Sequence, residues 1–98
     1  MKEVSLGLEK DWTDLPREIH FEQKLYYLLK DGNTYHLVSR VCPHSGGLIE
    51  FEDGELVCFV HGWSFDKHTG ACINIPGKQL AEHSVIARNG ELIVQIYN

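Results

Sequence analysis

Three dipeptides, Asp31-Gly32, Asp53-Gly54 and Asn89-Gly90, constrain the fold of this chain more than any other feature of its sequence. Each of them lies between two runs that are rich in leucine, aromatic and β-branched residues. An Asp-Gly or Asn-Gly pair in that setting is the strongest short-range signal for a tight β-hairpin, because these residues tolerate positive φ. The sequence therefore predicts three hairpins.

The strands expected around these turns cover much of the chain. They are residues 24–30 and 34–38 around the first turn, 48–51 and 56–59 around the second, and 83–87 and 91–97 around the third. The one stretch with helix-capping residues, 11–15, meets Pro16 within a turn and has no sustained helical period. Several short strands separated by turn signals are typical of an antiparallel sandwich or small barrel, so we expect an all-β fold.

Size and charge limit the classes of protein to which the chain can belong. Its 98 residues, 43% of them apolar, suit one globular domain over residues 1–98. Nine basic and fourteen acidic residues give a net charge of −5, which argues against a nucleic-acid partner and an anionic membrane surface. No apolar run approaches the ~20 residues that span a bilayer, and acidic residues interrupt the N-terminal segment where a signal peptide is apolar. We therefore expect a cytoplasmic protein with no membrane partner.

Two Cys/His pairs flank the second predicted hairpin. Cys42 and His44 precede it, and Cys58 and His61 follow it. Each pair comes at the end of an apolar strand and is followed closely by glycine, which lets the backbone turn tightly around a bound group. An odd number of cysteines, three, in a chain that we expect to lack a signal peptide makes a disulfide framework a poor explanation. We interpret these four residues as a metal site.

The ligand types leave two metals open. Two cysteines and two histidines form the ligand set of many structural zinc sites. The same set can hold a [2Fe-2S] cluster, with both cysteines on one iron and both histidines on the other.

A family resemblance separates these alternatives. Residues 41–48 (VCPHSGGL) and 58–66 (CFVHGWSFD) resemble the two cluster-binding loops of Rieske-type iron–sulfur proteins, whose pattern is Cys-x-His followed by Cys-x-x-His-Gly. Further segments resemble the family's later conserved segment, its proline loop and, more loosely, its opening strand and turn: Phe65-Asp66, Thr69-Gly70, Ile75-Pro76-Gly77, Trp12 and Asp14-Leu15-Pro16. The chain departs from the family in the connection between the loops, because only thirteen residues separate His44 from Cys58.

The resemblance implies a fold, a cofactor and a ligand set. The fold would be a Rieske-type antiparallel β-sandwich with a small cluster-binding subdomain at about residues 41–76. One [2Fe-2S] cluster would be bound per chain, with Cys42 and Cys58 on the buried iron and His44 and His61 on the outer iron. Because the shortening falls in the connecting hairpin and leaves both motifs whole, we expect the ligand geometry to be kept.

The resemblance also implies a function, electron transfer without catalysis. We expect a one-electron carrier, a Rieske ferredoxin that passes electrons from a flavin reductase to a terminal oxygenase. Alternatives are a small Rieske subunit of an oxygenase or nitrite reductase complex and, less favoured, a structural zinc module. High-potential relatives have a disulfide between the loops and donate serine and tyrosine hydroxyls to the cluster sulfurs. Here Gly47, Val60, Trp63 and Phe65 occupy those positions, which predicts a low potential.

The remaining candidates have simpler interpretations. Cys72 has no partner in a ligand pattern and is expected to be a small buried residue. Trp63 and Phe65 are expected to wedge the second loop against the scaffold. The acidic run of Glu50, Glu52, Asp53 and Glu55 is either a solvated hairpin tip or a docking patch for a basic partner. The other histidines are expected on strands or at the surface, with His68 close enough in sequence to tune the second loop: His20, His36, His68 and His83.

Overall fold

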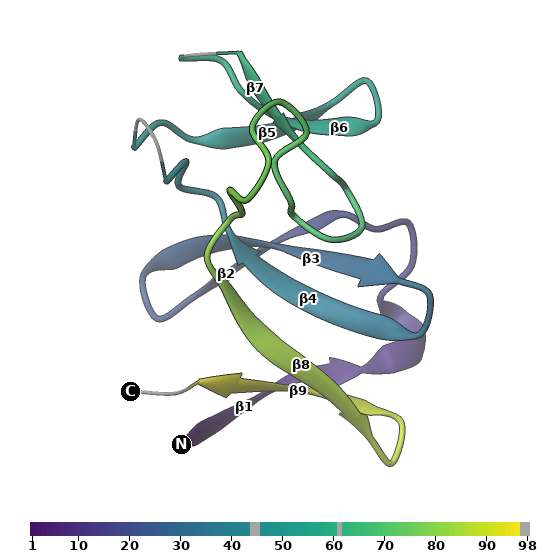
Figure 1. The fold of residues 1–98 in the computed structure, drawn as a ribbon. Coiled ribbons are helices and arrows are strands. Elements are labelled where there is room, and N and C mark those ends of the chain that lie inside the picture. The colour runs from purple at the N-terminus through teal and green to yellow at the C-terminus, as the bar shows by residue number, and fades with distance from the viewer. Residues whose placement is uncertain (44–45, 61, 97–98) are drawn as a thin grey trace.

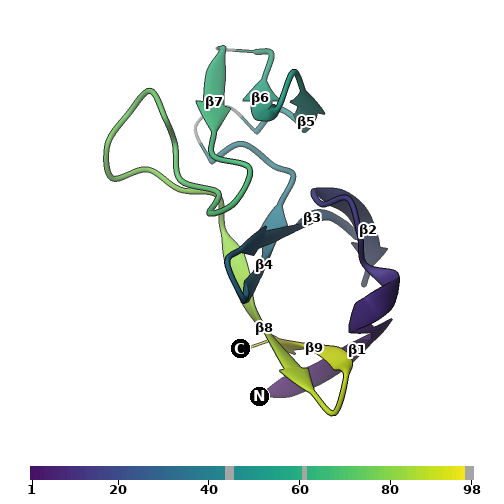
Figure 2. The same cartoon turned by 90° about the vertical axis from the view of Figure 1, so that its right-hand side faces the viewer.

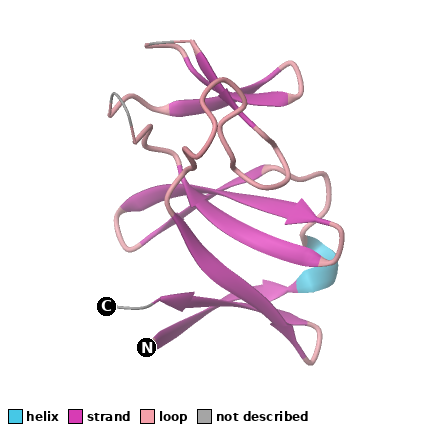
Figure 3. Cartoon of the chain, in the orientation of Figure 1, coloured by secondary structure: helices cyan, strands magenta, loops and turns pink. Residues whose placement is uncertain are grey.

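The computed structural model of the protein describes residues 1–43, 46–60 and 62–96. Within these residues the chain forms β-strands and one 3₁₀ turn, with no α-helix (Figure 3). The elements are β1 (Lys2–Leu8), η1 (Glu9–Asp11), β2 (Arg17–Phe21), β3 (Lys24–Asp31), β4 (Thr34–Ser39), β5 (Ile49–Glu52), β6 (Glu55–Cys58), β7 (Trp63–Phe65), β8 (Glu82–Arg88) and β9 (Glu91–Ile96). The expected all-β fold is confirmed. None of the described residues forms a helix that is long and apolar enough to cross a membrane.

The strands form two antiparallel sheets. The base sheet has the order β1-β9-β8-β4-β3-β2 and curls until its two edge strands approach each other (Figure 2). The small sheet has the order β5-β6-β7 and lies beyond β3 and β4, at the top of Figure 1. The chain enters the small sheet from the end of β4 and returns to the base sheet at β8.

The three predicted hairpins are present, and one turn is shifted by a residue. Asp53-Gly54 and Asn89-Gly90 each connect their strands with positive φ at both positions, as a type I′ turn requires. In the first hairpin Asp31 pairs with Thr34, so the turn is formed by Gly32 and the following residue rather than by Asp31-Gly32. Gly32 has φ +61°, which suits the first central position of a type II′ turn.

Three strands of the structure were not predicted from the sequence. β1, β2 and β7 are absent from the predicted set, and β2 joins β3 through a hairpin turn of Glu22 and Gln23. Both turn residues have positive φ although neither is glycine, asparagine or aspartate. That turn therefore carried none of the residue types that reveal the other three hairpins.

Two apolar cores explain why β3 is apolar along its centre. Tyr26 and Leu28 face the inside of the curled base sheet, where they pack with residues of β2, β4, β8 and β9. Tyr27 and Leu29 point the other way and pack with the small sheet and its loops. Because successive side chains of a strand face opposite sides, a strand that is covered on both faces needs consecutive apolar residues. The second core is the one that holds the loops in place.

Candidate metal centre

Two loops of the small sheet carry the predicted ligands. The first loop, residues 41–48, connects β4 to β5, and its ends meet in a bridge between Val41 and Leu48. The second loop, residues 58–63, connects β6 to β7, and its ends are the paired residues Cys58 and Trp63. Each cysteine therefore lies at the neck of its loop. His44 and His61 lie outside the described residues.

The backbone of the two loops follows the same pattern. The N–H of Gly46 donates to the carbonyl of Cys42 at 2.9 Å, and the N–H of Gly62 donates to the carbonyl of Cys58 at 2.8 Å. Gly46 and Gly62 have φ of +75° and +70°, a region that residues with a Cβ rarely adopt. In each loop a cysteine carbonyl thus accepts the N–H of a glycine four residues later. The same backbone hydrogen bond therefore recurs at both cysteines.

Both cysteine thiols are buried in the core between the sheets. Cys42 is 1% exposed and Cys58 is fully buried, and they share the cluster of Tyr27, Leu29 and Phe65. All three cysteines of the chain lie in the described part, and none of them is in a disulfide. Thiolates are the protein ligands that suit soft metals and iron–sulfur clusters. Two buried thiols on matching loops fit the sulfur half of a mixed Cys/His ligand set.

The comparison with protein families identifies the family of the chain. The family model of the Rieske [2Fe-2S] domain matches residues 4–93. The chain belongs to the Rieske family. It binds a [2Fe-2S] cluster, as the resemblance of the two loops predicted, and this decides against the zinc alternative. When bound, the cluster supplies the exchange of single electrons.

Solved structures show the same fold at low sequence identity. The plasma membrane Rieske protein of the cyanobacterium Synechocystis PCC 6803 superposes with a TM-score of 0.74 and 19% identity, over 95% of this chain and 99% of that one. The ferredoxin of carbazole 1,9a-dioxygenase from Nocardioides aromaticivorans IC177 superposes with a TM-score of 0.64 and 21% identity, over 96% and 97% of the two chains. Both likenesses concern the fold alone.

One curated relative is an enzyme. The cytidine monophosphate-N-acetylneuraminic acid hydroxylase of Cricetulus griseus is 36% identical over 72 residues. The match takes in 68% of this chain and 13% of the length of that hydroxylase. The Rieske domain here therefore corresponds to a small part of that relative.

The proline loop, residues 73–79, is fixed to β7 beside the second loop. Ile73 N–H donates to the Ser64 carbonyl at 2.8 Å, and Asn74 Oδ1 accepts the Ser64 N–H at 2.6 Å. Cys72 is buried, as expected, and its Sγ accepts the N–H of Ile75 at 3.4 Å. Trp63 packs against the core and Phe65 is fully buried in it, so the expected wedge is confirmed.

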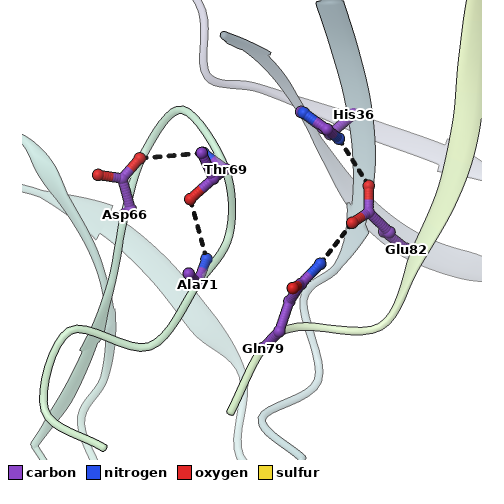
Figure 4. Close-up of polar contacts among 6 residues, drawn as sticks. All are labelled: His36, Asp66, Thr69, Ala71, Gln79 and Glu82. Atoms are coloured by element: carbon purple, nitrogen blue, oxygen red, sulfur yellow. Dashed lines mark hydrogen bonds and ion pairs between the residues drawn. The ribbon is translucent and has the colours of Figure 1, made fainter. Parts of the chain in front are cut away.

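The base of the proline loop is tied to the base sheet by a side-chain relay (Figure 4). Gln79 Nε2 donates to Glu82 at the start of β8, and the other oxygen of Glu82 lies 2.7 Å from His36 Nδ1 on β4. His36 therefore has a structural partner, as a strand residue is expected to have. His20 and His83 also lie on strands.

A turn after the second loop is organised by Asp66. Its Oδ1 accepts the N–H groups of His68 and Thr69 at 2.7 and 2.9 Å, and Thr69 in turn accepts the N–H of Ala71 (Figure 4). Partial burial opposes ionisation, yet these N–H donors lower the pKa of Asp66 below its usual value. His68 is exposed, and its Nδ1 lies 2.9 Å from the Lys30 carbonyl on β3.

The outer surface around the loops is apolar, with an acidic hairpin beside it. Phe59 and Val60, next to His61 in sequence, are each 62% exposed, and Ile73 is exposed on the proline loop. The acidic residues Glu52, Asp53 and Glu55 are exposed at the β5–β6 turn, whereas Glu50 pairs with Arg40. Arg40 was not singled out from the sequence. Arg40 comes two positions after the buried Val38, and side chains two positions apart in a strand face the same side. This spacing is the one feature of the sequence that could have indicated that Arg40 is buried.

Proposed function

We propose that Cys42, His44, Cys58 and His61 hold the cluster of this Rieske domain, and that the protein carries electrons from a flavin reductase to a terminal oxygenase. The observation that carries the ligand set is the pair of buried cysteines at the necks of two loops with the same backbone turn. The family match supports the electron-carrier role.

The surface supports a protein partner with a basic rim. The exposed apolar residues at the loop tips can bury against a complementary face, and apolar burial stabilises association. The exposed carboxylates of the β5–β6 turn and the net charge of −5 favour a partner with lysines and arginines around that face. The fold shared with the ferredoxin of carbazole 1,9a-dioxygenase is consistent with this assignment.

A second candidate is a Rieske component of an oxygenase or hydroxylase assembly. The 36% identity with the Cricetulus griseus hydroxylase favours it, because that relative is itself an enzyme. In this case the domain would donate electrons to a catalytic centre in the same assembly. Size-exclusion chromatography of the protein purified from its source separates a free carrier from a component of a larger assembly.

Spectra of the purified protein test the cluster and its ligands. We expect a coloured protein that gives, after reduction with dithionite, an EPR signal with the lowered average g-value of mixed Cys/His ligation. Cys42→Ser and His61→Ala are expected to lose this signal or to alter it, because each removes one ligand. Cys72→Ser is the matched control and should keep the wild-type signal. A wild-type spectrum in Cys42→Ser would remove that residue from the ligand set.

A further inference from the structure

Arg40 is the one charged residue that is buried among the described residues, with 6% exposure. It directly follows β4 and directly precedes the first loop. Burying a guanidinium is unfavourable unless its donors are hydrogen-bonded and its charge is paired. The partners of Arg40 therefore indicate what its burial achieves.

Arg40 is anchored to the base sheet by three contacts. Its guanidinium carbon lies 5.0 Å from the ring centroid of Tyr27 on β3, and its Nη1 lies 3.2 Å from Glu18 Oε1 on β2. Its backbone N–H donates to the carbonyl of Leu25 at 3.1 Å. Burial raises the pKa of the Tyr27 hydroxyl, and the hydroxyl oxygen accepts the N–H of Phe51 at 3.1 Å. Tyr27 is therefore a second contact between β3 and β5.

The same residue is joined to β5 through both its side chain and its backbone. Arg40 Nε donates to the Ile49 carbonyl at 3.0 Å, and the Ile49 N–H donates to the Arg40 carbonyl at 2.7 Å. Arg40 Nη2 donates to Glu50 Oε1 at 3.1 Å. Arg40 and Ile49 are the residues immediately outside the first loop. Their hydrogen bonds therefore close its neck.

This neck connects the two cysteines. Cys42 is two residues after Arg40, and Ile49 is the strand partner of Cys58 in the β5–β6 ladder. Any shift of Arg40 relative to Ile49 thus changes the position of Cys42 relative to Cys58. The fork of the guanidinium is needed here, because a lysine ammonium has no equivalent of Nε with which to bind Ile49 while it also reaches carboxylates on either side.

We propose that Arg40 is a positioning residue for the [2Fe-2S] cluster, acting by clamping the neck of the first loop between β5 and the base sheet. The proposal rests on the ligand set proposed above. Arg40 touches neither iron nor sulfur in this role. It fixes the spacing of the two cysteines before and after the cluster is bound.

Arg40→Met tests the clamp, with Arg88→Met as the matched control. Arg88 pairs with Glu3 across the β8 and β1 region of the base sheet, so its loss removes the same charge away from the loops. In Arg40→Met all four proposed ligands remain, and we expect the cluster to assemble with a shifted EPR g-tensor. We expect loss of the cluster to EDTA to become about tenfold faster. Hydrogen exchange of the amides in peptides spanning residues 40–50 should also become about tenfold faster, relative to exchange in peptides of β9.

Local exchange and the EPR signature separate positioning from general stability. A purely structural effect would speed exchange in β9 as much as in the first loop and would leave the g-tensor of the loaded protein unchanged. If Arg40→Met does not fold, Arg40→Lys replaces it, and the same shifts are expected because the Ile49 contact is lost. Glu50→Gln, which keeps Arg40, should show a smaller change in the same direction.

Two results would overturn the proposal without touching the proposed function. One is an Arg40 variant whose EPR spectrum, cluster loss and loop exchange match those of Arg88→Met. The other is Arg40→Lys behaving like the wild type in all three measurements. The proposed ligand set fails separately, through a wild-type spectrum in Cys42→Ser, and that outcome does not depend on Arg40.

Discussion

The three cysteines share burial but differ in what their atoms bind. The carbonyl groups of Cys42 and Cys58 each accept a hydrogen bond from the N–H of a glycine four residues later. The sulfur of Cys72 instead accepts the N–H of Ile75, inside the proline loop. Cys72 therefore braces the proline loop with its own side chain. The residue type alone cannot predict this difference, because it depends on where each cysteine lies in its loop.

Phe65→Tyr tests whether a hydroxyl from this position can reach the cluster. Phe65 is fully buried beside Cys42 and Cys58 in the core between the sheets. A hydrogen bond to sulfur stabilises the more negative, reduced state and raises the potential. A bond worth about 1 kcal/mol more in the reduced state corresponds to roughly +40 mV for one electron. Protein-film voltammetry measures the shift.

Phe65→Leu is the control for repacking alone in that experiment. It changes the side-chain volume at the same site without adding a hydroxyl, so it should leave the potential closer to that of the wild type. An equal shift in both variants would show that packing, rather than a hydrogen bond, moved the potential.

At the scale of elements, the hairpin turns show where sequence patterns are informative. Asp53-Gly54 and Asn89-Gly90 were recognised because their residue types match the positive φ that these turns require. The Glu22 and Gln23 turn also has positive φ at both positions, but its residue types do not indicate a turn. β1 was missed for a related reason, since Gly7 and a shift of register near it interrupt the alternation of Val4 and Leu6.

Gln23→Gly is expected to stabilise the protein. Gln23 has φ +64°, a conformation that costs a residue with a Cβ about 1–2 kcal/mol, and glycine loses part of this gain through its own entropy. A net gain of roughly 0.5 kcal/mol corresponds to a rise of about 2–4 °C in the thermal midpoint of the loaded protein. Gly90→Ala is the opposite control, because an added Cβ meets no atom within 4 Å and only the strain of φ +79° remains. A lower midpoint for Gln23→Gly would contradict the argument.

The two cores predict an uneven response to loss of iron. Cys42 and Cys58 belong to the core between the sheets, whereas Leu28 and Val94 belong to the core inside the base sheet. Removing the cluster withdraws a group that binds the folded state and should loosen the first core more than the second. Hydrogen exchange of the protein before and after chelation is expected to speed up in β5–β7 and to change much less in β9. Uniform acceleration in both sheets would show a single cooperative unit.

At the scale of the whole molecule, the sequence predicted the chemistry of the site better than the contacts that hold its loops in place. The two motifs identified the family because ligand types and their spacing are local in the chain. Arg40 was missed because its partners Glu18, Tyr27 and Ile49 come from three separate strands, and only the folded arrangement brings them together. The backbone turns over Cys42 and Cys58 became visible only with the structure.

Several properties of the whole chain disfavour gain of an electron. The net charge of −5 adds an opposing field, although solvent and salt weaken it. The N–H groups of Gly46 and Gly62 already donate to the backbone carbonyls of Cys42 and Cys58. By the resemblance of the second loop, Trp63 and Phe65 take the positions at which high-potential Rieske proteins have hydroxyl donors, and neither side chain carries a hydroxyl.

These properties all disfavour reduction, so we expect a reduction potential toward the low end of the Rieske range, about −150 mV rather than about +300 mV. Protein-film voltammetry of the loaded wild type at low and at physiological ionic strength measures it. Because salt screens the field of exposed charges, the potential should rise slightly with ionic strength. The contribution of hydrogen bonds to the potential is local, so it should not change with ionic strength. A wild-type potential well above zero at both salt concentrations would contradict this expectation, because it would show that hydrogen-bond donors to sulfur stabilise the reduced cluster.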